Sequence, residues 1–141
     1  GQKGEITVAG TLSSRSAVIF DLDGDGDLDI VTNEFNAAPQ VFVSDLARKR
    51  AIHFLQVRLV GGASNRDGLG ATVRVRAGST VYAKYSDGKS GYLSQSDLPL
   101  YFGLGDAPKA DRVEVQWPSG RKSVVDRDIP RNGTLRVEEP R

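Results

Sequence analysis

The 141-residue sequence contains no cysteine and no methionine, and it has a single histidine and a single tryptophan. Without cysteine, neither a disulfide framework nor a thiolate-ligated metal site holds the fold together. Without a second histidine or a cysteine, zinc sites and nucleophilic triads are nearly excluded. Stability therefore has to come from apolar packing or from a metal that is bound through oxygen ligands.

Long apolar runs and an excess of one charge are also missing. No run approaches the ~20 apolar residues of a membrane span, and no signal-peptide pattern is present. Nineteen basic and eighteen acidic side chains give a formal net charge of +1, which is too balanced for a nucleic-acid-binding or polybasic membrane surface. A glycan, a small molecule or a protein is the favoured partner. Because the sequence begins with Gly, we expect it to be a processed or excised part of a longer chain, from which a targeting segment has been removed.

Alternation of apolar and polar residues dominates the sequence, which is the period of a half-buried β-strand. It is clearest in residues 71–77 (ATVRVRA) and recurs in residues 53–60, 113–117 and 134–138. The glycines and prolines lie mostly between these runs, as turns require. No stretch of comparable length shows helical spacing. The sequence therefore predicts an all-β protein, either an antiparallel β-sandwich or a barrel.

A basic run at residues 47–51 (ARKRA) interrupts the alternation. We interpret it as a solvated linker, with a proteolytic processing site as the alternative. It separates residues 1–50, where short strands are expected near 17–20, 29–33 and 40–43, from residues 51–141, which contain the longer alternating strands. Two domains with these bounds are predicted.

Aspartate occupies every second position of the segment DLDGDGDLD, at Asp21, Asp23, Asp25, Asp27 and Asp29. Neighbouring carboxylates about 4 Å apart repel each other by roughly 4 kcal/mol per pair at an effective dielectric constant near 20. The spacing matches a calcium loop, with side-chain oxygens at positions one, three, five and nine, a glycine at six and a backbone carbonyl at seven. We predict that these five aspartates bind Ca²⁺, with Asp27 contributing its carbonyl.

The position that carries a closing glutamate in helix-loop-helix calcium sites is Thr32 here, and β-branched residues flank the loop. The loop is therefore expected to join two strands. Asp29 then has to contribute both of its oxygens, or a water molecule has to fill the gap.

The segment VIFDLDGDGDLDI also matches the opening of a haloacid-dehalogenase phosphatase, in which Asp21 would be the nucleophile and Asp23 the general acid. That chemistry needs a hydroxyl residue where Asp25 stands, and an α/β sheet with helical crossovers that the sequence does not suggest. We therefore predict that the chain is not an enzyme. An unoccupied acidic turn, a hydrolase accessory domain and a phosphatase-like enzyme are the alternatives.

Two known families resemble parts of the sequence. VIFDLDGDGDLDIVTN followed by QVFVSD resembles the FG-GAP or VCBS repeat, one blade of the β-propellers of many secreted proteins. FLQVRLVGGASNRDGLGATVRV, SGYLSQSDLPLYFGLGDAPKADRVEVQWPSG and NGTLRVEE resemble the ASPIC/UnbV domain, which follows such repeats. The resemblance implies a secreted, cell-surface or periplasmic protein that serves as a binding or adhesion module, with calcium in a structural role.

Propellers need about four to eight blades, and residues 1–50 have room for one. A single blade leaves sheet edges unpaired. We expect it to dock onto the sandwich and to be the last fragment of a longer protein.

Aromatic residues carry the alternative of a carbohydrate-binding module. Tyr82, Tyr85 and Tyr92 flank the polar loop SDGKSG, and strict alternation puts Tyr82 and Tyr85 on opposite strand faces, so at least one ring should reach solvent. Trp117 ends an alternating strand, where core packing is favoured over a platform for a ligand.

Two further positions are open to more than one interpretation. His53 lies at the start of a predicted strand, where a solvated role is favoured over that of a general base. Asn65 and Asp67 are expected to form a tight turn, and a second metal site is the alternative.

Overall fold

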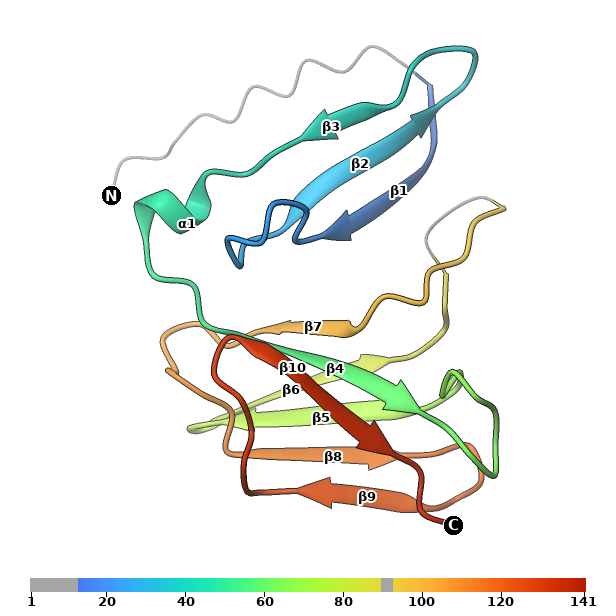
Figure 1. The fold of residues 1–141 in the computed structure, drawn as a ribbon, viewed down its shortest axis with the longest axis vertical. Helices are drawn as coiled ribbons and strands as arrows, with labels where there is room; N and C mark the ends of the chain where they lie inside the picture. The colour runs from blue at the N-terminus through green and yellow to red at the C-terminus, as the bar shows by residue number, and fades with distance from the viewer. Residues whose placement is uncertain (1–12, 90–92) are drawn as a thin grey trace.

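The computed structural model describes residues 13–89 and 93–141 (Figure 1). Ten strands form three sheets with the orders β1-β2-β3, β10-β4-β7 and β6-β5-β8-β9. The strands are β1 (Ser14–Phe20), β2 (Asp29–Glu34), β3 (Gln40–Phe42), β4 (Phe54–Val60), β5 (Thr72–Ala77), β6 (Thr80–Tyr85), β7 (Leu100–Gly103), β8 (Arg112–Gln116), β9 (Lys122–Val125) and β10 (Gly133–Glu138). The predicted all-β fold is confirmed.

The sheet β10-β4-β7 packs on the sheet β6-β5-β8-β9 and forms a sandwich, with no closed barrel among the described residues (Figure 1). Strand β10 runs parallel to β4, and the other strand pairs are antiparallel. The core lies between the two sheets. Its largest fully buried apolar side chains are Trp117, Phe102, Leu55, Val57, Val73, Val75, Val113 and Val115.

Strand β5 shows why the alternation predicted this fold. Val73 and Val75 are fully buried in the sandwich core, whereas Arg74 and Arg76, which alternate with them, are exposed. Burying a valine side chain contributes roughly 1.5 kcal/mol or more, whereas burying an unpaired charge is costly. A shift of the strand by one residue would exchange the two sets, so the pattern fixes which face points inward.

Trp117 has the core position that the sequence favoured. Its side chain is 1% exposed, and its indole N–H donates a hydrogen bond to Ser123 Oγ at 2.9 Å. A Cβ atom on Gly68, whose φ is +64°, would lie 3.1 Å from the indole ring, so the backbone is closely packed against it. The ring has no exposed face to offer a ligand.

The loop at residues 61–70 is held by hydrogen bonds between its own residues. Asn65 donates from its side-chain amide to the Leu69 carbonyl at 2.8 Å and accepts the Leu69 N–H at 2.7 Å, while Asp67 pairs with Arg66 at 2.9 Å. A Cβ atom on Gly61 would lie 1.7 Å from the Asn65 carbonyl oxygen, which leaves no room for a side chain. These contacts are those of the predicted tight turn.

The N-terminal sheet lies beside the sandwich, with β1 as its strand nearest to it (Figure 1). Its three strands cover the segments predicted near residues 17–20, 29–33 and 40–43. The predicted linker contains a single helical turn, α1 (Leu46–Lys49), which the sequence did not indicate. Arg48, Lys49 and Arg50 are exposed, as expected for a solvated segment. Within the described residues, no helix is long and apolar enough to cross a bilayer.

A buried carboxylate fastens the end of the sandwich. Glu139, which follows β10, is 6% exposed. Its Oε2 accepts hydrogen bonds from the Gly62 N–H at 2.8 Å, the Ser64 N–H at 3.0 Å and Ser64 Oγ at 2.9 Å, and its Oε1 accepts one from Ser119 Oγ at 2.5 Å. Burial alone would raise the pKa of this carboxyl, but the hydrogen bonds from Ser119, Ser64 and Gly62 outweigh burial and lower the pKa from 4.5 to about 2.

Glu139 should therefore contribute to acid sensitivity. Because its pKa is lower in the folded state, its contribution to stability is complete above about pH 4.5 and is lost as the pH falls toward 2. We expect Glu139→Gln to lower the thermal midpoint at pH 7 by about 3 °C or more and to reduce the fall in midpoint between pH 5 and pH 2. Thermal unfolding followed by circular dichroism across this range measures both effects. Glu138→Gln, at an exposed neighbour, is the control, and identical pH profiles for the two variants would contradict the prediction.

Candidate metal centre

The acidic loop connects β1 to β2 and closes where Phe20 faces Asp29 in the antiparallel pair. Gly24 and Gly26 have φ values of +83° and +93°, a region that other residues rarely adopt. These two left-handed residues allow the chain to turn tightly between β1 and β2. The local sequence therefore determines the turn that gathers the carboxylates.

Three of the five predicted aspartates converge. Asp21, Asp23 and Asp29 each place a carboxylate oxygen within 4.8 Å of the others. Asp25 is exposed and accepts the Asp27 N–H at 3.0 Å. The donor set contains oxygen atoms and no nitrogen or sulfur, which suits a hard cation such as Ca²⁺ rather than zinc or copper.

Backbone N–H groups hold two of these carboxylates in place. Asp21 accepts the Gly24 N–H at 2.7 Å on Oδ1 and the Gly26 N–H at 3.0 Å on Oδ2. Asp29, which is 1% exposed, accepts the Leu22 N–H on Oδ2 and the Ser44 N–H on Oδ1, both at 2.8 Å. These bonds fix the side chains across the loop and tie the loop to the segment after β3.

Asp27 has a buried side chain, a feature that the sequence did not reveal. The residue is 3% exposed, and its Oδ2 accepts the Ala47 N–H of α1 at 2.7 Å. Its Oδ1 is also buried and has no hydrogen-bond partner among the described residues. A buried carboxylate oxygen without a partner is costly. The converging oxygens of Asp21, Asp23 and Asp29 have the donor chemistry of a hard-cation site, and this orphaned Asp27 atom is not one of them.

The loop also contacts the sandwich. The Tyr101 hydroxyl of β7 donates a hydrogen bond to the Gly26 carbonyl at 2.6 Å. The Tyr101 ring stacks on Phe54 of β4, with ring centroids 5.2 Å apart and planes at 13°. A Cβ atom on Gly26 would lie 2.9 Å from Phe54 Cε1, so only glycine fits without movement of the ring. The docking that we expected of the N-terminal sheet therefore takes place through the acidic loop.

The carboxylates affect the tyrosine electrostatically. The pKa of Tyr101 is raised to about 12. Burial of the hydroxyl is the largest cause, and the negative charges of Asp21, Asp27 and Asp25 are the others. The hydroxyl is therefore protonated at neutral pH and able to donate to Gly26. Tyr101 was missed by sequence reasoning because its contact with the loop spans 75 positions in the chain.

Of the predicted aromatic ligand-binding residues, the three that the structure describes do not share one exposed surface. Tyr82 faces Val75 in the strand register and packs against the core, whereas Tyr85 faces Thr72 and is 61% exposed. Trp117 lies inside the sandwich, and Tyr92 lies outside the described residues. Tyr85 is thus the one predicted aromatic residue that the described structure presents to solvent. His53 is half-buried just before β4.

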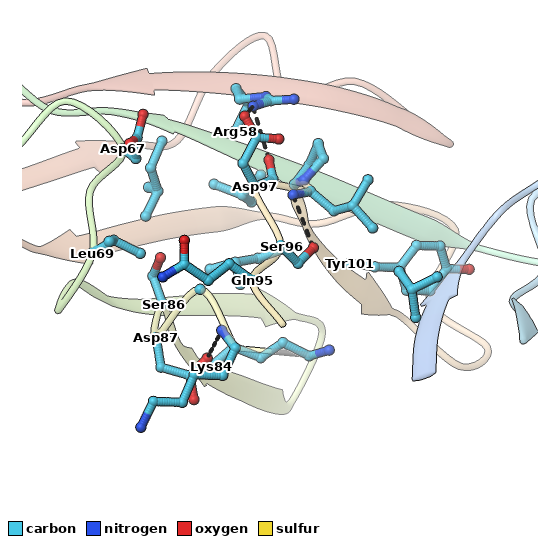
Figure 2. Close-up of a pocket in the computed structure, with 18 of the residues that line it drawn as sticks. Arg58, Asp67, Leu69, Lys84, Ser86, Asp87, Gln95, Ser96, Asp97 and Tyr101 are labelled. Carbon is cyan, nitrogen blue, oxygen red and sulfur yellow. Dashed lines mark hydrogen bonds and ion pairs between the residues drawn. The ribbon is translucent and has the colours of Figure 1, made fainter. Parts of the chain in front are cut away.

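An open cavity of about 890 Å³ lies between β1 and the sandwich (Figure 2). Its lining mixes aliphatic side chains with charged ones, including Lys84 and an ion pair of 3.4 Å between Arg58 and Asp97. Tyr101 is its aromatic lining residue, and one face of that ring is covered by Phe54. Among the described lining residues, the cavity thus offers at most one face of a single aromatic ring to a sugar.

Comparisons with known proteins match most of the chain. The family model described as "ASPIC and UnbV" matches residues 61–141. The chain is similar to Cartilage acidic protein 1 of Homo sapiens, with 32% identity over 134 residues that cover 88% of this chain and 19% of the relative. The same protein of Xenopus tropicalis is 31% identical over 132 residues, covering 86% of this chain and 19% of the relative. The chain thus spans about a fifth of the length of these relatives.

The two ends of the carboxylate cluster should differ in their importance for folding. Asp29 is buried and accepts two backbone N–H groups, whereas Asp23 is exposed and accepts one long bond of 3.3 Å from Asp25. With a chelator present to remove calcium, we expect Asp29→Asn to lower the free energy of unfolding by about 1–3 kcal/mol. The asparagine amide has one acceptor oxygen, so it cannot accept both backbone N–H groups that Asp29 accepts. Asp23→Asn should change it by less than about 0.5 kcal/mol. Urea unfolding measures both, and equal losses would contradict the assignment.

Proposed function

This chain belongs to the ASPIC and UnbV family, and we propose that it is a non-catalytic binding module that works outside the cell and is stabilised by a calcium ion. The observation that carries the proposal is the convergence of Asp21, Asp23 and Asp29 at the turn between β1 and β2. Three carboxylates within 4.8 Å of one another repel strongly unless a cation lies among them.

The residues of the loop have separate tasks in this proposal. Asp21, Asp23 and Asp29 supply carboxylate oxygens to the ion, and Asp25 and the Asp27 carbonyl complete the predicted ligand set. Calcium supplies a divalent charge and accepts irregular coordination by six to eight oxygens. The N–H groups of Leu22, Gly24, Gly26 and Ser44 hold the carboxylates in position before the ion binds.

We further propose that β1, β2 and β3 form an FG-GAP or VCBS-type blade of a larger propeller. Both faces of this sheet expose aliphatic side chains. Ile19 and Ile30 are paired on one face, at 58% and 39% exposure, and Val41 is 53% exposed on the other. A sheet with two apolar faces is typical of a layer that packs between neighbours. The greater length of the relatives supports the same interpretation.

A location outside the cell agrees with the expected strength of the ion site. Calcium sites of extracellular modules often bind at about 10⁻⁴ to 10⁻³ M. Such a site is filled at extracellular calcium concentrations and is empty at the much lower concentrations of cytosol. The similarity to Cartilage acidic protein 1 supports a secreted protein.

An extracellular protein is a better partner than a glycan. Among the described residues, seven of the thirteen exposed large hydrophobic side chains lie on and around the small N-terminal sheet, at Ile19, Leu22, Ile30, Phe35, Val41, Val43 and Leu46. Apolar surface of this kind marks protein contacts. The carbohydrate-binding alternative depends on exposed aromatic residues, and Tyr85 is the only exposed residue among the described candidates. An adhesion or assembly role is therefore the function we favour.

An enzymatic role receives less support. The phosphatase alternative requires a hydroxyl side chain two residues after Asp23, where Asp25 stands. No helical crossover covers β1, β2 or β3 within the described residues. The hydrolase accessory alternative predicts no catalytic residue in this chain, so it is a special case of a binding module.

Calcium should raise the stability of the protein by mass action. At a free concentration of 100 times the dissociation constant, binding adds about 2.7 kcal/mol to the free energy of unfolding. We expect the thermal midpoint to rise with calcium and to fall when a chelator is added. Asp23→Ala should abolish most of the rise, whereas Asp126→Ala, at an exposed position outside the loop, should retain it. A midpoint that does not respond to calcium or chelator would contradict the proposal.

Glycan arrays with and without calcium test the nature of the partner. Because the candidate aromatics do not form a shared surface, we expect wild type and Tyr85→Ala to show the same low retention on every polysaccharide. Selective retention of wild type, lost in Tyr85→Ala, would instead support the carbohydrate-binding alternative.

A further inference from the structure

The acidic loop is bonded to three separate parts of the molecule. Gly26 accepts the Tyr101 hydroxyl from the sandwich at 2.6 Å. Asp27 accepts the Ala47 N–H of α1 at 2.7 Å, and Asp29 accepts the Ser44 N–H, between β3 and α1, at 2.8 Å. The segment that gathers the metal ligands is therefore also the segment that joins the N-terminal sheet to the connector and to the sandwich.

We propose that Tyr101 and Phe54 are positioning residues of the calcium site, and that ion binding and docking of the N-terminal sheet on the sandwich strengthen each other. This inference rests on the calcium site proposed above. Both residues act through Gly26, because Tyr101 donates to its carbonyl and the Phe54 ring lies next to its Cα atom. The two events are linked thermodynamically. If docking raises the calcium affinity by some factor, calcium binding raises the equilibrium constant for docking by the same factor.

The geometry at Gly26 explains how the sandwich acts on the ligands. Gly26 is buried and lies between Asp25 and Asp27, so the orientation of its peptide units determines where both neighbours point. The Tyr101 hydrogen bond fixes its carbonyl, and Phe54 packs where a side chain would otherwise be. If the sandwich moves away, the Gly26 carbonyl loses its donor and the backbone is free to leave the left-handed conformation.

Gly24 offers a matched comparison within the same loop. Its φ of +83° is close to the +93° of Gly26, but a Cβ atom on Gly24 would meet nothing within 4 Å. An alanine at either position carries the same kind of backbone strain. Only the alanine at position 26 would also push Phe54 away, so the difference between the two variants isolates the effect of docking on the ion site.

Isothermal titration with CaCl₂ measures the effect on affinity. We expect Tyr101→Phe to weaken calcium binding roughly fivefold, the usual effect of one hydrogen bond. Tyr85→Phe, which removes an exposed hydroxyl from β6, should leave affinity unchanged. We expect Gly26→Ala to weaken binding about tenfold more than Gly24→Ala does, because it adds the clash with Phe54.

A lysine-specific endoproteinase measures the reciprocal effect, because Lys49 lies in the exposed connector. In wild type, saturating calcium should slow cleavage after Lys49 several-fold. In Tyr101→Phe, the same calcium concentration should slow this cleavage clearly less. Lys109, in an exposed loop of the sandwich, is the internal control for the protease itself and should be cleaved at the same rate with calcium and with chelator.

The outcomes separate the inference from the proposed function. If wild type shows no calcium binding, the proposed function fails. If wild type binds calcium but Tyr101→Phe matches Tyr85→Phe in affinity and in protection of Lys49, the calcium site stands and the coupling is overturned. If Gly26→Ala does not fold, the pair of tyrosine variants decides the question alone.

Discussion

Repulsion among the carboxylates of one hairpin is the constraint on which the account depends. Asp21, Asp23 and Asp29 bring their oxygens within 4.8 Å, and backbone N–H groups hold Asp21 and Asp29 there, while no lysine or arginine of the described residues forms an ion pair with them. Hydrogen bonds of this kind orient a carboxylate but leave its charge in place. This concentration of negative charge is the basis on which we propose that a divalent cation binds there.

The same hairpin links the two halves of the described structure. The sandwich is stabilised by its own core, from Leu55 to Val137, and by the Glu139 carboxylate that fastens its end. The N-terminal sheet has a much smaller share of buried apolar residues and exposes aliphatic side chains on both faces. Its position therefore depends on a few specific contacts, chiefly those between Gly26 and the stacked pair of Tyr101 and Phe54.

Most of the fold was predictable because strand periodicity is a local signal. Valines at every second position of β5 identify the buried face without any knowledge of its neighbours. The positions of the aspartates likewise predict a carboxylate cluster from spacing alone. The buried side chain of Asp27 and the hydrogen bond from Tyr101 were not predictable, because each depends on how distant segments meet. Tyr82 illustrates the reverse problem, since the sequence shows that an aromatic ring is present but not whether other residues cover it.

The most direct test of the central claim is a high-resolution crystal structure of the protein grown in calcium, with anomalous scattering data collected to identify the ion. The account predicts an anomalous peak among Asp21, Asp23 and Asp29, with carboxylate oxygens about 2.3–2.6 Å from it. Water alone between those side chains, at hydrogen-bonding distances and without an anomalous signal, would contradict it.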